Sequence, residues 1–330
     1  MIHKLKQNLD IIKKAHKLRE IVKNSLWNLY LYTVLKPPYV KLELTDGSKL
    51  IVDYSNYIEI LDNYYLGNIV DLYEDRIKVK AEDDIYFIPV GNLSYYTIDQ
   101  LLFYLREGWI CWGSYWERYK AKFRHIYYSI VKIFEEKKWD FLNVQNKSVL
   151  DIGAFVGDSA IYFILKGAKK VYAIEPYPNA YNEMWDNIIL NDMEKQIIPI
   201  NVGINYKRNY VVINTKKIDE AEDTLFKSEG IGMRIPAGKL SKIIDKYNID
   251  AQVLKIDCMG CEYDLILKDY DTIKEFEEIG FKYNAYNTKI SINELLKKLN
   301  RDFDCRIIQN WSNLEWPEGK KGILHCIRKR

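Results

Sequence analysis

One run of the sequence restricts the fold more than any other. In residues 149–159 an apolar strand ends at an acid and passes through spaced glycines into a helix. Gly153 and Gly157 allow the backbone to turn tightly and a ligand to approach it closely. Asp158 or Ser159 can cap the helix, whose amide-rich first turn faces the crevice. This strand, turn and helix predict a site for a nucleotide-like ligand.

Two acids at strand ends indicate which ligand. Asp151 ends the first strand, and Glu175 ends a second apolar run 24 residues later, where a carboxylate can accept both ribose hydroxyls. A dinucleotide site would place glycine where Phe155 stands, because a pyrophosphate lies against bare backbone. The Asp151 carboxylate suits a cation better, and S-adenosyl-L-methionine carries an ammonium and a sulfonium group. We therefore predict S-adenosyl-L-methionine as the cofactor.

From residue 147 onward, strands alternate with helices, as in a doubly wound parallel α/β sheet. Strands expected at 196–201 and 253–257 end at the same edge as the first two, where ligands of open sheets bind. Runs at 305–308 and 322–327 predict a closing antiparallel pair. The cofactor-binding residues predicted along the shared edge are Asp151, Gly153, Ala154, Gly157, Asp158, Ser159, Glu175, Pro176, Asn201, Val202, Gly203 and Asp257.

The length of 330 residues, with 48% hydrophobic content, exceeds what one compact domain needs. We predict two domains. Residues 1–110 form an α+β extension, an N-terminal helix plus a small β-rich domain with a hairpin turning at Asp46-Gly47, and residues 111–330 form the cofactor-binding domain. The sequence has no signal-peptide pattern and no membrane-spanning apolar run, so we expect a cytoplasmic protein.

The charge of the chain is nearly balanced, with 49 basic and 46 acidic residues and a net charge of +3, which does not by itself imply a nucleic-acid-binding surface. Residues 1–24 are the exception, with seven basic residues against two acidic ones. Apolar residues at helical spacing make this segment a predicted basic amphipathic helix. It could contact an anionic membrane or RNA weakly; the alternative is a helix docked on its own protein with a solvated basic face.

The fourth strand carries a resemblance to a known family. Leu254–Glu262, together with Asp151-Ile152-Gly153-Ala154 and Ile174-Glu175-Pro176, resembles the FkbM-type S-adenosylmethionine-dependent methyltransferases over residues 147–285. The resemblance implies a Rossmann-like class I methyltransferase fold and O-methylation of a sugar, a glycan or a small metabolite.

The resemblance also places Asp257 and Glu262 at the reaction crevice. Where the family has a glutamate this chain has Met259, and where the family has a Glu and a His two residues apart it offers Lys282 and Asn284. We therefore predict no metal ligands. A hydroxyl acceptor must lose a proton, for which Asp257 is the first candidate base and Glu262 the second, unless either orients the substrate or caps a helix. Lys282 could lower the pKa of the acceptor or bind an acidic substrate.

The cysteines suggest no further chemistry. Cys258 and Cys261 follow the spacing of the methyltransferase motif, which disfavours a metal or redox role. In a reducing cytoplasm, Cys305 and Cys326 are expected to be free thiols.

Three functions remain open from the sequence. The first is a small-molecule or glycan O-methyltransferase. The second is an RNA methyltransferase, although the members that methylate amino groups often carry Asn-Pro-Pro-Tyr at the fourth strand, where this chain has Asp257-Cys258-Met259-Gly260. The third is a protein that binds the cofactor without catalysis.

Overall fold

The computed structural model describes residues 2–35, 37–213, 232–258, 261–284, 290–310 and 321–330. Contacts within the chain divide it into two compact units, residues 1–120 and 121–330. The division falls ten residues beyond the boundary expected from the sequence. Each unit is described by itself.

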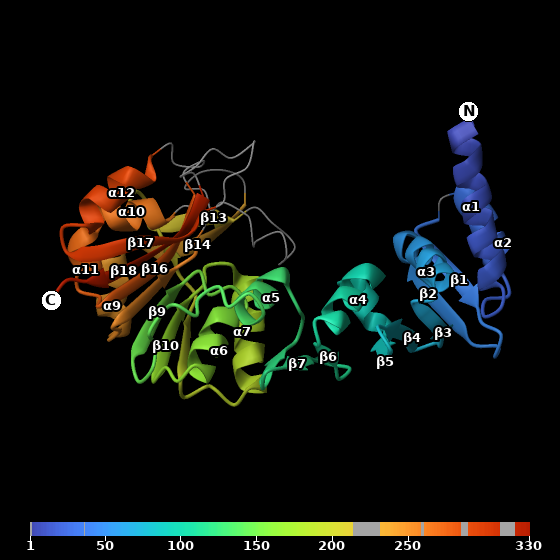
Figure 1. Cartoon of the computed structure of the whole chain (residues 1–330), viewed down its shortest axis with the longest axis horizontal. Coiled ribbons are helices and arrows are strands. Elements are labelled where there is room, and N and C mark those ends of the chain that lie inside the picture. The colour runs from blue at the N-terminus through green and yellow to red at the C-terminus, as the bar shows by residue number, and fades with distance from the viewer. Residues whose placement is uncertain (1, 36, 214–231, 259–260, 285–289, 311–320) are drawn as a thin grey trace. The chain divides into compact units, whose positions relative to one another are not determined.

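Unit 1 combines helices with short antiparallel strands (Figure 1). Strand β1 pairs with β2 as the expected hairpin, β3, β4 and β5 form a second antiparallel sheet, and β6 pairs with β7. Its elements are α1 (Ile2–Leu18), α2 (Ser25–Leu35), β1 (Tyr39–Glu43), β2 (Lys49–Asp53), α3 (Tyr54–Leu66), β3 (Ile69–Leu72), β4 (Arg76–Ala81), β5 (Asp84–Pro89), a 3-10 turn (Val90–Ser94), α4 (Ile98–Arg106), β6 (Ile110–Cys111) and β7 (Trp116–Arg118).

The basic N-terminal helix is shorter than the sequence suggested and packs on its own unit. Helix α1 ends at Leu18 rather than continuing to residue 24, and α2 begins at Ser25. Ala15 and Leu18 are fully buried, whereas Leu9 and Ile12 are exposed. Part of the predicted apolar stripe therefore belongs to the core of unit 1.

Unit 2 is built on a seven-stranded sheet in the order β11-β10-β9-β15-β16-β18-β17, in which β18 runs opposite to the other six strands. A smaller sheet has the order β12-β14-β13. The elements are β8 (Ala121–Phe123), α5 (Tyr128–Phe134), β9 (Ser148–Ile152), α6 (Asp158–Leu165), β10 (Lys170–Ile174), α7 (Pro178–Leu190), β11 (Ile197–Ile200), β12 (Gly203–Ile204), β13 (Tyr210–Ile213), β14 (Met233–Gly238), α9 (Leu240–Tyr247), β15 (Val253–Ile256), α10 (Cys261–Lys268), α11 (Tyr270–Ile273), β16 (Glu278–Asn284), α12 (Ile292–Leu299), β17 (Phe303–Asn310) and β18 (Lys321–Arg328).

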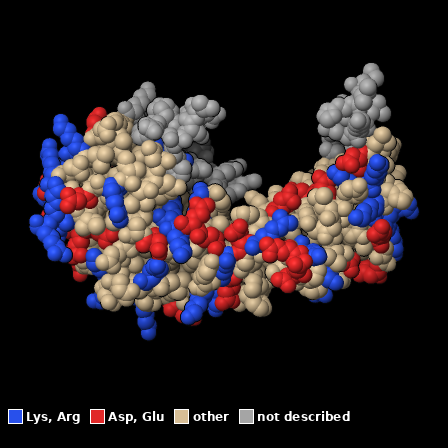
Figure 2. Space-filling view, in the orientation of Figure 1, with Lys and Arg blue, Asp and Glu red and all other residues tan. Residues whose placement is uncertain are grey.

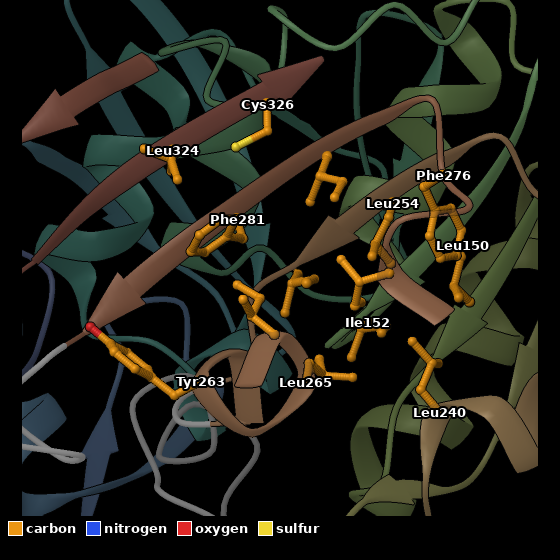
Figure 3. Packing of buried hydrophobic residues seen from close by; sticks show 14 of the residues in the cluster. Leu150, Ile152, Leu240, Leu254, Tyr263, Leu265, Phe276, Phe281, Leu324 and Cys326 are labelled. Atoms are coloured by element: carbon orange, nitrogen blue, oxygen red, sulfur yellow. The ribbon is translucent and has the colours of Figure 1, made fainter. Parts of the chain in front are cut away.

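The doubly wound α/β fold and the closing antiparallel pair predicted from the sequence are confirmed. Because side chains alternate across a strand, each central strand has two different faces. One face carries Leu150, Ile152 and Leu254, which pack in an apolar cluster with Leu240 of α9 and Leu265 of α10 (Figure 3). The other face presents the polar side chains that build the site described below.

The prediction of free thiols at Cys305 and Cys326 was wrong, because the two residues form a disulfide. They lie directly opposite each other on β17 and β18, and this antiparallel register brings their side chains together. Cys258 and Cys261 form a second disulfide, and Cys111 is the free cysteine among the described residues. The prediction failed because it assumed a reducing environment and did not consider the cross-strand pairing of these two cysteines.

None of the helices among the described residues combines the length and apolar character needed to cross a bilayer.

Candidate active site

The turn after β9 has the backbone conformation that its glycines suggested. Gly153, Phe155 and Gly157 all have positive φ angles, of 78°, 50° and 85°. A Cβ atom on Gly153 would overlap the backbone carbonyl of Asp257, so only glycine fits where the ends of β9 and β15 meet. The N–H groups of Gly153 and Ala154 both donate to Ile174 O at 3.0 Å, which joins the turn to the end of β10.

Phe155 occupies its left-handed conformation because two contacts hold it there. Its N–H donates to Glu175 Oε2 at 3.0 Å. Its ring packs edge-on against Tyr127, with 5.2 Å between the ring centres. A bulky residue in this region of φ is strained, and such strain persists only where surrounding contacts fix it.

Glu175 lies buried just beyond the end of β10 and faces the turn. Its second carboxylate oxygen accepts the N–H of Tyr177 at 2.8 Å, so each oxygen has a backbone donor. Burial raises the pKa of Glu175 to about 7, because the backbone hydrogen bonds offset only part of the lost hydration. Asn201 steadies this segment by donating to the carbonyls of Glu175 and Pro176.

The start of α6 lies next to the turn. Gly157 is the residue before the helix, and Asp158 begins it. The Asp158 side chain accepts the N–H of Ser159 at 2.9 Å, and burial raises the pKa of this carboxyl. Val202 is buried, and Gly203 opens β12. The cofactor residues expected from the sequence therefore follow the carboxyl ends of neighbouring strands.

Asp151 is placed differently from the expectation that its carboxylate meets a bound cation. It is fully buried, and the cation beside it is Lys255 of β15, whose Nζ lies 2.7 Å from Asp151 Oδ1. Ser159 Oγ donates to Asp151 Oδ2 at 2.6 Å. Sequence reasoning missed Lys255, although a lysine inside a buried four-residue strand, β15, was a visible signal.

Asp257, which follows β15, lies among lysines. Lys138 Nζ donates to Asp257 Oδ2 at 2.6 Å, and Lys282 Nζ lies 3.6 Å from Asp257 Oδ1. Burial opposes ionisation of Asp257, but the positive charges of Lys138 and Lys282 outweigh it and hold its pKa below the usual range. Burial lowers the pKa of Lys138, despite the opposing charge of Asp257.

The structure thus brings together two of the three predicted catalytic residues. Asp257 and Lys282 share one cluster, while Glu262 lies buried in the first turn of α10, where its Oε2 is 3.5 Å from Cys258 Sγ. Lys138 is a cluster member that sequence reasoning missed, and no motif surrounds it. Met259 lies outside the described residues.

No group of three or more His, Cys, Asp or Glu side chains suited to a metal ion occurs among the described residues. The two histidines of unit 2 instead contact glutamates: His125 Nδ1 lies 3.1 Å from Glu183 and His325 Nε2 lies 2.7 Å from Glu278.

The sheet identifies the class of protein. Numbered along unit 2 from β9 and leaving the small sheet aside, its order is 3-2-1-4-5-7-6 with the seventh strand antiparallel, whereas a dinucleotide-binding sheet has the order 3-2-1-4-5-6. This is the Rossmann-like fold of the class I methyltransferases. The tight turn beside a buried strand-end carboxylate fits a nucleoside cofactor.

Residues 113–219 match the family model described as the TRM5/TYW2 methyltransferase domain. Together with the fold, this match shows an S-adenosylmethionine-dependent methyltransferase with S-adenosyl-L-methionine as its cofactor. The class is the one expected from the sequence, while the matched family differs from the FkbM type.

Solved structures are also similar, at low TM-scores. M. jannaschii TYW2 in complex with AdoMet has 18% identity, covers 67% of this chain and 90% of its own, and has a TM-score of 0.34. The M. jannaschii tRNA m1G37 methyltransferase has 13% identity, 92% and 67% coverage and a TM-score of 0.34. The O-methyltransferase from Bacillus cereus has 10% identity, 56% and 74% coverage and a TM-score of 0.36. No curated protein sequence matches the chain.

Proposed function

We propose that the protein transfers a methyl group from S-adenosyl-L-methionine to a hydroxyl of a sugar, a glycan or a small metabolite. The observation that carries this proposal is the cluster of Lys138, Lys282 and Asp257 at the carboxyl end of the central strands. A hydroxyl is a weak nucleophile until it loses its proton, and this cluster supplies positive charge where the resulting oxygen anion would need it.

The cofactor supplies a methyl group already activated by its positive sulfur, so alignment of the acceptor provides much of the rate. The ammonium group of Lys282 stabilises the negative charge that develops on the acceptor oxygen. Asp257 is a weak base because its pKa is lowered, so its role is to orient the two lysines and accept the hydroxyl hydrogen bond. Lys138, whose pKa is lowered by burial, is the better group to receive the proton, which it takes as a neutral amine; the ammonium group formed in this step adds to the positive charge beside the oxygen.

The other edge of the site holds the cofactor in this proposal. Glu175 accepts the ribose hydroxyls, and Asn201 keeps the Glu175–Pro176 segment in place. The turn from Gly153 to Gly157 and the start of α6 offer backbone amides. Of the cofactor residues predicted from the sequence, those proposed for this edge are Gly153, Ala154, Gly157, Asp158, Ser159, Glu175, Pro176, Asn201, Val202 and Gly203. Asp151 is instead paired with Lys255, and Asp257 lies with Lys138 and Lys282 on the acceptor side.

RNA methylation is the second candidate, favoured by the match of residues 113–219 to the TRM5/TYW2 model. We place it second because Asp257 and its lysines stand where many amino-methylating enzymes carry Asn-Pro-Pro-Tyr. In Figure 2, basic side chains gather at the left edge, while basic and acidic side chains are interspersed over the rest of the visible face; a nucleic-acid-binding surface is usually a continuous basic stripe.

A transfer assay separates the candidates. The full chain is incubated with donor labelled on the methyl group and with three separate pools: glycans, small metabolites and total RNA. We expect label in a glycan or metabolite as an ether that resists mild alkali, and S-adenosylhomocysteine should suppress it. Label confined to RNA and lost after ribonuclease treatment would replace the proposal with the second candidate. Donor binding without transfer to any pool would favour a non-catalytic protein.

A further inference from the structure

A buried lysine on the cofactor side of the sheet has no part in the chemistry described above. Lys255 occupies β15, where all four residues are buried, and its side chain is only 3% exposed. Placing an ammonium group in such a strand carries a large desolvation cost unless the group is fully paired. Its partners therefore indicate why a lysine stands there.

Lys255 joins three consecutive parts of the cofactor turn. Its Nζ lies 2.7 Å from Asp151 Oδ1 at the end of β9, donates to Gly153 O at 2.7 Å inside the turn, and donates to Ser159 Oγ at 3.2 Å in the first turn of α6. It also lies over the ring of Trp139, 5.6 Å from the ring centre. One side chain thus connects the strand, the turn and the helix.

The register of the sheet explains how this connection forms. Residues 255 and 151 are direct partners in the parallel pair of β15 and β9, so both side chains project on the same face. Asp151 neutralises the lysine, and Ser159 satisfies the second oxygen of Asp151. The carbonyl of Gly153, at a positive φ, receives a charged donor, which opposes relaxation of the turn to another conformation.

We propose that Lys255 is a positioning residue for the methyl donor: by holding the Gly153 carbonyl and the Asp151 carboxylate together, it fixes the turn in the shape that binds S-adenosyl-L-methionine. The ammonium group does not touch the cofactor. Instead, it holds in place the backbone of the turn that contacts the cofactor. The turn therefore loses its conformational entropy when the protein folds and not when the cofactor binds.

Two variants separate positioning from simple stability. Lys255→Met keeps an apolar stem of similar length beside Trp139 but leaves the charge of Asp151 buried alone. The double variant Lys255→Met with Asp151→Asn removes both charges and keeps an oxygen that can accept from Ser159. The matched control is Lys147→Met, which removes the lysine of a half-exposed ion pair with Glu277, 3.1 Å away.

Three measurements on the full chain need no methyl acceptor, so their results do not depend on the proposed hydroxyl substrate. Thermal unfolding gives the midpoint, calorimetry gives the dissociation constant of the donor, and hydrogen exchange without donor reports on residues 152–157. For the double variant we expect a thermal midpoint near that of the wild type and faster hydrogen exchange confined to the turn. Donor binding should weaken about tenfold or more, which is the effect of losing one charge-assisted hydrogen bond. The control should match the wild type in all three. Wild-type affinity and exchange in the folded double variant would overturn the proposal and leave the pair a purely structural one.

Discussion

Glu175 and Asp257 both follow central parallel strands and both lie at the site, yet their surroundings shift the pKa values of their carboxyl groups in opposite directions. Glu175 accepts two backbone N–H groups, and burial raises its pKa to about 7. Asp257 is also buried, but Lys138 and Lys282 hold its pKa below the usual range. The surroundings of Glu175 suit recognition of neutral hydroxyls, and those of Asp257 keep its carboxylate ionised. In the proposed function, the donor edge (Glu175 and the turn Gly153–Gly157) recognises the cofactor, and the acceptor edge (Lys138, Asp257 and Lys282) polarises the acceptor hydroxyl.

The largest effect should come from removing a lysine at the acceptor edge. Lys138→Met removes the group that receives the proton of the acceptor hydroxyl, so we expect transfer to slow by about 100-fold or more. The dissociation constant of the donor should stay within about twofold, because the Lys138 ammonium group donates to Asp257 and not to a residue of the Gly153–Gly157 turn. Single-turnover kinetics and calorimetry measure the two quantities.

Lys169→Met is the matched control for this variant, since Lys169 is exposed before β10. Asp257→Asn gives a further check. It should slow transfer comparably, because it releases the two lysines from their common partner. If Lys138→Met weakened donor binding as much as it slowed transfer, the division of the site into two edges would be wrong.

The two edges also differ in how much of their structure could be predicted from the sequence. The turn at Gly153 and Gly157 depends on neighbours in the chain, so its conformation could be predicted, as could the order of strands and helices around it. Lys138 is 119 residues from Asp257, and only the folded sheet brings them together. Lys255 could have been found, because a lysine in a buried strand needs an acid on the neighbouring strand. The Cys305–Cys326 disulfide was missed because an assumed compartment took precedence over cross-strand pairing.

The second effect concerns the donor edge. Glu175→Ala should weaken donor binding by about 1 to 3 kcal/mol, since ribose hydroxyls would lose their acceptor and the N–H groups of Phe155 and Tyr177 would lose theirs. Once the donor is saturating, transfer should be close to that of the wild type. Calorimetry and transfer rates at high donor concentration test this pair of outcomes. Unchanged affinity in a folded variant would remove Glu175 from the cofactor site.

A smaller effect follows from the raised pKa of Glu175, about 7 against an ordinary value of 4.5. Only the carboxylate accepts two ribose hydroxyls, so donor affinity should fall as the pH drops below 7, by at most about 30-fold at pH 5.5. The free energy of unfolding should change in the opposite direction and increase as the pH falls. The folded pKa exceeds the unfolded one, so the contribution of Glu175 is complete below pH 4.5 and is lost as the pH rises through 7.

Glu175→Gln should bind the donor more weakly and with little dependence on pH between 5.5 and 8, which calorimetry at several pH values would reveal. Asp257 stays ionised over this range because its pKa is lowered, so Asp257 should not contribute to the change in affinity. A pH dependence that survives in Glu175→Gln would assign the titration to another group.

The smallest effect on the site should come from unit 1. Lys13 and Arg19 are exposed, and reversing both charges in the full chain, as Lys13→Glu with Arg19→Glu, should leave donor affinity unchanged because every proposed cofactor residue lies in unit 2. If α1 recruits an anionic partner, the same variant should bind acidic vesicles or RNA a few times more weakly, and wild-type binding should fade above roughly 0.15 M salt as screening increases. The neutral variant Lys13→Gln with Arg19→Gln should fall between the two. Equal binding by all three proteins would leave α1 as a packing helix, consistent with the buried side chains of Ala15 and Leu18.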